Sequence, residues 1–397
     1  MPPNSAVVPR HRADYAEAMI GLACGLMAMT ALAFIRAIVT DPPGMQDFIV
    51  YWATAQQLVH HLNPYDLHAL SALEHSRGLQ AAETGFMRNP PWTLPLVLPL
   101  GLVGAKAGAI VWSALLAVIL IAAVRIVSPA VRMAGSSAAW IGFFSPLAIN
   151  AAAAGQTPLF ALLGLTLFLR LHRTRPFAAG AGLALCMVKP HLLIVCVPVL
   201  LLWIVLRRAW TVLLGAVTAL AVSCAVTEWI DPAAWRQYLA WAHSSGISNE
   251  RMPCLSVTLR DLIAPTANWL TYVPAAIACV WAVAYFWKRR EQWDWVEHGA
   301  LVTLVSLLAA PYCFPWDQCL AIPALMFAAA RTRSRAALAV LALSYIGLIV
   351  EQLCGVSVRS PLWLWTAPFW LGWFLWARAT AARPVTAVEA APALSVG

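Results

Sequence analysis

Charged residues are scarce in this chain of 397 residues. Asp, Glu, Lys and Arg together make up 11% of the sequence, less than half of the roughly 25% that soluble domains carry. Hydrophobic residues make up 61%, and the mean hydropathy is +0.74. So few charges cannot cover a water-exposed surface. The composition therefore excludes a soluble globular protein and predicts an integral membrane protein.

Several sequence motifs of soluble enzymes are also missing. The chain has no phosphate-binding loop of the G-x-x-x-x-G-K-[ST] type, no G-x-G-x-x-G motif and no G-x-S-x-G motif, so nucleotide-driven and serine-nucleophile chemistry are unsupported. The nine Cys include no C-x-x-C pair, and the His residues show no spacing typical of metal ligands. We therefore expect no bound metal.

Apolar stretches that can cross a membrane recur along the whole chain. They predict an all-α polytopic membrane protein with about twelve transmembrane helices, because a helix needs roughly 20 apolar residues to span a bilayer. We expect these helices at about residues 17–39, 106–124, 138–152, 156–171, 177–188, 190–206, 209–226, 268–287, 296–310, 316–330, 335–352 and 361–378. Several stretches are short, which indicates a cavity that reaches below the membrane surface.

Basic residues cluster in the short loops on one side of the predicted bundle. Because Lys and Arg are enriched on the cytoplasmic side of membrane proteins, we expect both termini in the cytoplasm and the protein in the cytoplasmic (inner) membrane. Basic anchoring also accounts for the net charge of +9, so we expect no nucleic-acid partner. Residues 1–16 then form a cytoplasmic segment, residues 17–378 a single integral membrane domain, and residues 379–397 a disordered cytoplasmic tail.

Two long loops, at about residues 40–105 and 227–267, are expected on the outer side. In the first loop, apolar residues from Phe48 to Val59 recur at helical spacing and predict an amphipathic helix along the membrane surface. Asp66 is placed to cap a second short helix.

Some polar or Pro-containing turns are not explained as cytoplasmic anchors, and almost all of these are predicted on the outer side. They are Gln46-Asp47, Asn63-Pro64-Tyr65-Asp66, Asn89-Pro90-Pro91, Gly155-Gln156, Lys189-Pro190-His191 and Pro311-Tyr312. Polar groups from distant parts of a chain that meet on one face indicate a site there. The pattern leaves three function classes open: a membrane enzyme, a multi-pass transporter or flippase of a lipid-linked or small polar substrate, or a non-catalytic membrane scaffold.

These turns resemble glycosyltransferase family 87. The run Asp47–Trp52, followed by Asn63–Asp66, is similar to the opening signature of this family, and Asn89-Pro90-Pro91, Gly155-Gln156, Lys189-Pro190 and Pro311-Tyr312 follow in the family's order. The resemblance implies a GT-C fold and a transferase that moves a hexose, mannose by default, from a polyprenyl-phosphate sugar to a lipid or glycan hydroxyl at the periplasmic face. It implies membrane lipid as a partner and no cofactor. It does not fix the oligomeric state.

Asp47 matches the catalytic Asp position of the family and is the expected general base. An acceptor hydroxyl is a weak nucleophile, so a carboxylate is needed to take its proton. An Asp at a helix start also suits a capping role, which the sequence does not separate from catalysis.

Cationic and polar residues of the outer face form the expected donor site, because a leaving phosphate needs positive charge or N–H donors beside it. This group comprises Lys189, His191, Gln156, Arg88 and Arg260. As an alternative to phosphate binding, Lys189 can lie at a helix end and extend its ammonium toward water. Gln156 also suits a hydrogen bond to a backbone carbonyl.

A third group of residues is expected to contact the acceptor or the sugar. It comprises Tyr51, Asn63, Tyr65, Asn89, Tyr312 and Asp317. Tyr51 follows Asp47 by four residues and therefore shares its helix face. Two alternatives remain: packing in the protein core for Tyr51, and a turn at Asn63 that leaves Tyr65 at the membrane interface.

Overall fold

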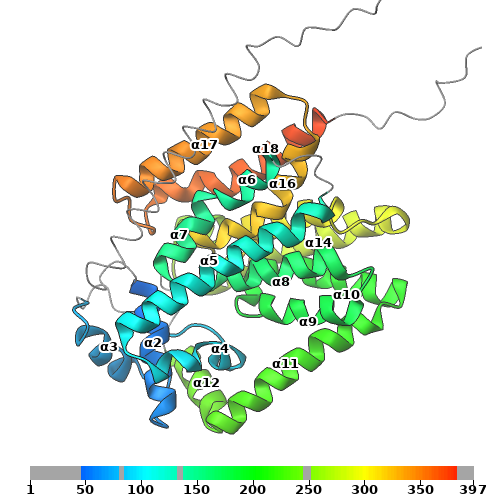
Figure 1. Ribbon diagram of the computed structural model, residues 1–397. Coiled ribbons are helices and arrows are strands. Elements are labelled where there is room, and N and C mark those ends of the chain that lie inside the picture. The colour runs from blue at the N-terminus through cyan, green and yellow to red at the C-terminus, as the bar shows by residue number, and fades with distance from the viewer. Residues whose placement is uncertain (1–45, 80–84, 132–136, 245–251, 382–397) are drawn as a thin grey trace, which may run out of the picture.

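The computed structural model describes residues 46–79, 85–131, 137–244 and 252–381. All regular elements in these ranges are helices, and no strand occurs within them (Figure 1). The helix predicted over residues 17–39 and nearly all of the predicted tail lie outside the described residues. The all-α prediction holds for the described part of the chain.

The N-terminal helices lie together at one end of the bundle, in blue to cyan in Figure 1. They are α2 (Gln46–Val59), α3 (Leu67–His75) and α4 (Leu94–Val97), with the 3-10 helices η2 (Pro91–Thr93) and η3 (Leu98–Leu102) on either side of α4. The Asp66 carboxylate accepts the backbone N–H groups of His68 and Ala69 at 2.9 and 3.1 Å. The predicted second helix and its cap are therefore confirmed.

The central part of the chain forms a continuous series of packed helices. They are α5 (Ala105–Ala130), α6 (Ser137–Phe143), α7 (Pro146–Ala154), α8 (Pro158–Leu171), α9 (Pro176–Cys186), η4 (Pro190–Leu193), α10 (Cys196–Arg207) and α11 (Trp210–Ile230). Helices α7, α8 and α9 each begin with Pro. Pro fits this position because its missing N–H would have no partner in the first turn. The prolines thus set where these helices start.

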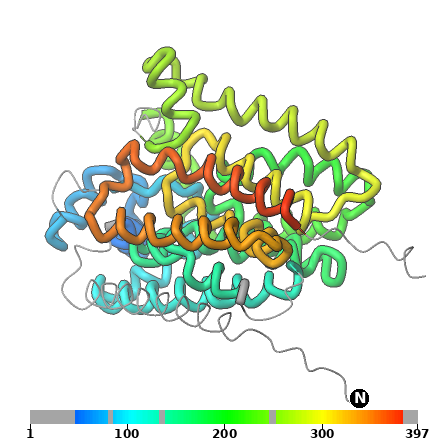
Figure 2. The backbone as a smooth tube through the Cα atoms, turned by 90° about the horizontal axis from the view of Figure 1, so that it is seen from above, coloured from blue at the N-terminus to red at the C-terminus, as the bar shows by residue number. Residues whose placement is uncertain are grey.

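The C-terminal part completes the bundle. Its elements are α12 (Ala234–Ser244), α13 (Leu255–Ile263), η6 (Asn268–Tyr272), α14 (Val273–Arg289), η7 (Arg290–Gln292), α15 (His298–Ala309), η8 (Pro315–Ala321), α16 (Ile322–Arg331), α17 (Arg335–Leu353), η9 (Pro361–Trp365) and α18 (Thr366–Ala379). Helices α17 and α18, in orange and red, run side by side (Figure 2). The turn that joins them lies at one end of this pair.

Four helical segments of the described chain are long and apolar enough to cross a membrane. They are α5, α11, α17 and Asn268–Gln292, which contains α14. Val118, Val217 and Val280 on three of them are more than half exposed, as expected of a surface that faces lipid. Further apolar helices of 10–17 residues are shorter than a perpendicular span. One of the predicted stretches, residues 138–152, is divided between α6 and α7.

Helix α2 lies in the protein interior, where it contacts η3, α5 and α7. Phe48, Ile49 and Ala53 are fully buried, and Tyr51 is 5% exposed. The helix itself is as predicted, but its surroundings differ from the expected membrane surface. Apolar residues at helical spacing look the same in a sequence whether lipid or protein covers them.

Gly155 ends α7 and brings it against α2. Its φ of +77° lies in the left-handed region, which Gly adopts without strain. A Cβ at this position would lie 2.6 Å from the Cβ of Phe48. The indole N–H of Trp112 donates to the Gly155 carbonyl at 2.8 Å. The predicted turn is confirmed, and it places Gln156 near the start of α2.

Candidate functional site

Predicted site residues from five separate segments line one cavity of about 500 Å³. Asp47 and Tyr51 come from α2, Arg88 and Asn89 from the loop before η2, Gln156 from the turn between α7 and α8, Lys189 and His191 from the α9–η4 junction, and Tyr312 from the turn after α15. Five of the six polar turns expected on one face therefore meet here.

Asp47 lies in the first turn of α2, and its side chain lines the cavity. Burial raises the pKa of the Asp47 carboxyl above its ordinary value, and a hydrogen bond with Gln156 and the charges of Lys189 and Arg88 oppose this rise. A carboxylate with a raised pKa is a stronger proton acceptor than a solvent-exposed Asp.

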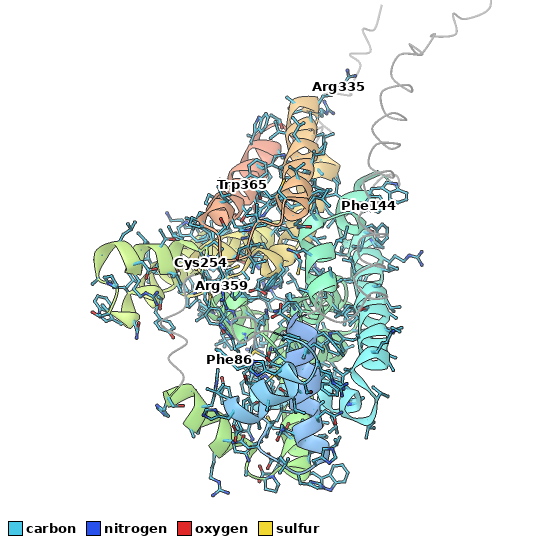
Figure 3. All side chains as sticks on the ribbon, turned by 90° about the vertical axis from the view of Figure 1, so that its left-hand side faces the viewer. Phe86, Phe144, Cys254, Arg335, Arg359 and Trp365 are labelled. Atoms are coloured by element: carbon cyan, nitrogen blue, oxygen red, sulfur yellow. The ribbon has the colours of Figure 1, made fainter. Side chains whose placement is uncertain are left out.

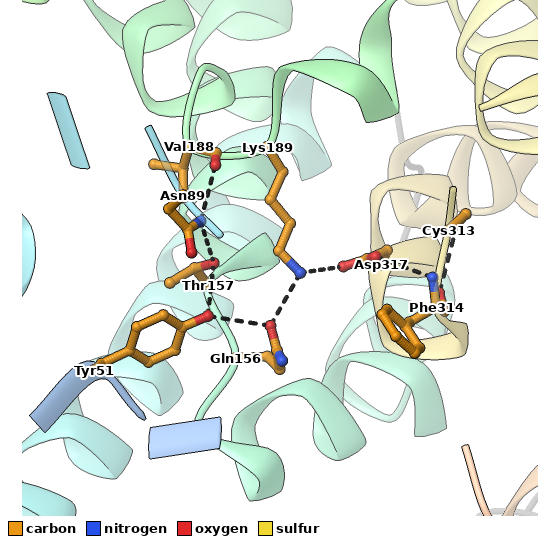
Figure 4. A network of polar contacts seen from close by, with 9 residues as sticks. All are labelled: Tyr51, Asn89, Gln156, Thr157, Val188, Lys189, Cys313, Phe314 and Asp317. Carbon is orange, nitrogen blue, oxygen red and sulfur yellow. Dashed lines mark hydrogen bonds and ion pairs between the residues drawn. The ribbon is translucent and has the colours of Figure 1, made fainter. Parts of the chain in front are cut away.

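The side chain of Gln156 connects α2 with Lys189. Its Oε1 accepts the ammonium of Lys189 at 3.0 Å and the hydroxyl of Tyr51 at 3.3 Å (Figure 4). Gln156 also hydrogen-bonds with the Asp47 carboxylate, and the amide NH₂ is the group that can donate there, because a carboxylate only accepts. The Gln156 side chain is therefore bonded to side chains of the cavity rather than to a backbone carbonyl.

Lys189 forms a buried ion pair with Asp317 of η8. The Lys189 Nζ lies 2.7 Å from Asp317 Oδ1, and the two side chains are 11% and 1% exposed. The second oxygen of Asp317 accepts the backbone N–H of Phe314 at 3.0 Å (Figure 4). The Lys189 side chain thus points to a carboxylate inside the protein rather than reaching toward bulk water, and Asp317 is its counterion.

Asn89 holds the loop that precedes η2 against the Lys189 turn. Its Nδ2 donates to the carbonyl of Val188 at 2.9 Å and to Thr157 Oγ1 at 3.4 Å. The neighbouring Arg88 places its guanidinium over the ring of Phe86, 4.3 Å from the ring centroid. Asn89 therefore holds the backbone next to Lys189 in place, while Arg88 adds positive charge to the cavity lining.

His191 and Tyr312 form a stacked pair in the cavity lining. Their ring centroids are 3.6 Å apart, with an angle of 26° between the planes. Nε2 of His191 is buried without a hydrogen-bond partner among the described residues. An aromatic face beside a ring nitrogen that has no protein partner suits contact with a sugar, which offers both C–H groups and hydroxyls.

Four predicted site residues do not line the cavity. One is Asp317, which is connected to the cavity lining through its ion pair with Lys189. Asn63 Oδ1 accepts the backbone N–H of Tyr65 at 2.9 Å, which forms a local turn. Tyr65 is 3% exposed, and its hydroxyl donates to the Asn89 carbonyl at 3.1 Å, so it is buried rather than at an interface. Arg260 is 3% exposed and pairs with Asp261 at 2.7 Å. Asn63 and Tyr65 thus support the loop that carries Asn89.

The cavity lining also includes residues that the sequence pattern did not single out. Phe86, Tyr238, Val358 and Arg359 belong to it. Val358 and Arg359 lie in the turn between α17 and η9. The alternation of inner and outer loops that the sequence predicts puts this turn on the same side as the other polar turns, so the signal was present in the sequence.

The arrangement can accept a proton and stabilise a negative charge in one cavity. Asp47 offers the proton acceptor, and cationic side chains line the same space. Within the described ranges, no three His, Cys, Asp or Glu side chains come together as metal ligands.

Comparison with known proteins identifies one family. The model of glycosyltransferase family 87 matches residues 86–311, more than half of the chain. The matched segment contains Asn89, Gln156 and Lys189, whereas Asp47 precedes it and Asp317 follows it. No curated protein sequence and no solved structure matches the chain.

Proposed function

Since this chain belongs to glycosyltransferase family 87 and carries membrane-type helices, we propose that it transfers a hexose from a polyprenyl-phosphate sugar to a hydroxyl of a lipid or glycan acceptor. Mannose is the sugar that the family resemblance suggests first. The proposal includes a GT-C arrangement of about twelve spans in the inner membrane, with both termini in the cytoplasm and the cavity open to the periplasm.

In the proposed reaction, the acceptor hydroxyl attacks the anomeric carbon of the sugar while Asp47 takes the hydroxyl proton. The bond between the anomeric carbon and the phosphate oxygen breaks, and its electron pair leaves with polyprenyl phosphate. One glycosidic bond replaces one glycosyl phosphate bond, and attack from the face opposite the phosphate inverts the anomeric configuration. Positive side chains of the cavity stabilise the charge on the leaving phosphate.

The observation that supports this mechanism best is the position of Asp47. It occupies one cavity with Arg88 and Lys189, and burial raises its carboxyl pKa. A base and a cationic region in the same space match the two demands of the reaction, proton removal from the acceptor and charge stabilisation on the leaving group.

The test is transfer of radiolabelled mannose from polyprenyl-phosphate-mannose to a membrane lipid extract by purified protein. Asp47→Asn is expected to lower the rate by about 10²–10⁴-fold, the usual contribution of a general base. Because Asn caps helices as well as Asp does, a residue that acts only as a cap would tolerate this change.

Asp66→Asn is the matched control, since Asp66 caps α3 outside the cavity lining. This variant is expected to keep wild-type activity. Full activity in Asp47→Asn would refute the assigned base. No transfer by the wild type from any of several polyprenyl-phosphate sugars, with lipid and glycan acceptors both offered, would refute the proposed reaction.

A further inference from the structure

Arg359 is a cation of the cavity lining that lies outside the segment matched by the family. Resting on the proposed function, we infer that Arg359 binds the phosphate of the polyprenyl-phosphate donor. The inference follows from the charge balance of the cavity, from the way the Arg359 turn is held, and from the chemistry of the guanidinium group.

The charge of Lys189 is already neutralised within the protein. Asp317 lies 2.7 Å from its ammonium, and Gln156 Oε1 accepts a second hydrogen bond at 3.0 Å. The two bonds occupy two of the three N–H groups of Lys189. A phosphate that relied on Lys189 alone would meet an ammonium that a carboxylate already neutralises, so a cation other than Lys189 is needed. Besides Arg88, whose guanidinium lies over the ring of Phe86, the cavity lining offers Arg359.

Arg359 meets that need. Its side chain is exposed and lines the cavity, and no ion pair joins it to another described residue. Figure 3 labels Arg359 and Phe86, which reach the same cavity from opposite ends of the chain. Arg359 thus adds a positive charge to the lining that also contains Arg88 and Lys189.

Hydrogen bonds fix the turn that carries Arg359 to the 3-10 helix η9. Ser357 Oγ accepts the backbone N–H of Arg359 at 3.3 Å, and the Ser357 carbonyl accepts the indole N–H of Trp363 at 3.0 Å. Trp363 is 1% exposed. The backbone at Arg359 is therefore held in place, and its long side chain is exposed at the cavity.

The chemistry of Arg suits a phosphate ester. A guanidinium stays charged at every physiological pH, and its planar N–H groups pair with two phosphate oxygens at once. The charge on those oxygens rises as the sugar leaves, so Arg359 stabilises the departing polyprenyl phosphate as well as the bound donor.

The experiment measures transfer kinetics and direct binding of polyprenyl phosphate for the wild type, Arg359→Ala and Arg359→Lys. Arg359→Ala is expected to raise the KM for the donor and the Kd for polyprenyl phosphate by about 10- to 100-fold, as for loss of a charge-assisted hydrogen bond. Arg359→Lys is expected to recover part of the loss, because it keeps the charge without the paired N–H groups.

Arg335→Ala is the control, because Arg335 is an exposed Arg at the other end of α17 (Figure 3) and does not line the cavity. It should bind like the wild type. Unchanged KM and Kd in a folded Arg359→Ala protein, or failure of the wild type to bind polyprenyl phosphate, would overturn the inference. If the wild type transfers no sugar but binds polyprenyl phosphate through Arg359, the reaction is wrong and the phosphate site stands. Inorganic phosphate as a competitor shows whether the lipid chain is needed.

Discussion

Replacing Asp317 with Asn is expected to destabilise the protein more than replacing Asp317 and Lys189 together. The single change leaves the buried ammonium of Lys189 without the carboxylate that lies 2.7 Å away. Removing one partner of a buried ion pair costs about 3–5 kcal/mol. Asn still offers an oxygen to the Phe314 N–H that Asp317 accepts at 3.0 Å. The loss therefore reports the missing charge rather than the η8 turn.

The double variant Lys189→Met/Asp317→Asn removes both charges. Replacing a buried ion pair with neutral residues of similar volume is often close to neutral in stability. The hydrogen bond from Lys189 to Gln156 is also lost, which costs about 1 kcal/mol. We therefore expect the double variant to lose about 1–2 kcal/mol, less than either single variant.

The assay is thermal unfolding of the purified protein in detergent, followed by Trp fluorescence. Glu297→Gln serves as the control. The ion pair of Glu297 with Arg378 is more exposed than the Lys189–Asp317 pair, with side chains 45% and 28% exposed respectively. Ion pairs of this kind contribute little to stability. The single variants Asp317→Asn and Lys189→Met should both unfold at a lower temperature than the double variant. If Asp317→Asn unfolds at the same temperature as the wild type, the ion pair does not stabilise the fold as argued.

Three other changes test separate parts of the structure. Asp47 must be ionised to act as a base, and burial raises its pKa. The transfer rate should therefore rise with pH through a pKa above that of a free Asp. A rate profile that is flat above pH 4 would contradict this. Gly155→Ala should lower the unfolding temperature by an amount equivalent to at least about 1 kcal/mol, since Ala is strained at this positive φ and its Cβ would meet Phe48. Burial raises the pKa of Glu74 to about 7 in the folded protein. Between about pH 5 and 7, Glu74 therefore holds a proton in the folded protein that it releases in the unfolded chain. The stability of the protein falls as pH rises through this range. Glu74→Gln should therefore raise the unfolding temperature more at pH 8 than at pH 5, and an equal gain at both would argue against this.

The turns that build the cavity are readable from the sequence because their chemistry is local. Gly155 ends α7 with a positive φ, where the sequence predicts a turn at Gly155-Gln156. The start of α7 at Pro146 is a mark that the prediction missed, because it falls inside the predicted stretch 138–152. Counting apolar stretches between the predicted turns places the polar turns on one side. The predicted alternation of inner and outer loops puts Asp47 and Lys189 on one face, and in the structure both line one cavity.

The ion-pair partners of the site residues cannot be predicted from the sequence in the same way. Lys189 and Asp317 are 128 residues apart in the chain, and nothing in either neighbourhood indicates the other. The sequence offers Lys189 as a free cation, whereas the fold gives it a counterion. Arg260 shows the opposite case, because its partner Asp261 is its neighbour in the sequence. Long-range pairing depends on helix packing, which apolar periodicity alone does not specify.

Asp47, Gln156, Lys189 and Asp317 form a continuous line of polar contacts drawn from four distant segments. Losing one charge leaves its neighbour buried and unbalanced, so a substitution at one position alters what the next can tolerate. We therefore expect these four positions to covary among homologous sequences: a relative with a neutral residue in place of Asp317 should also lack the Lys at position 189. In evolution, the line would be inherited as one unit, kept whole or exchanged whole.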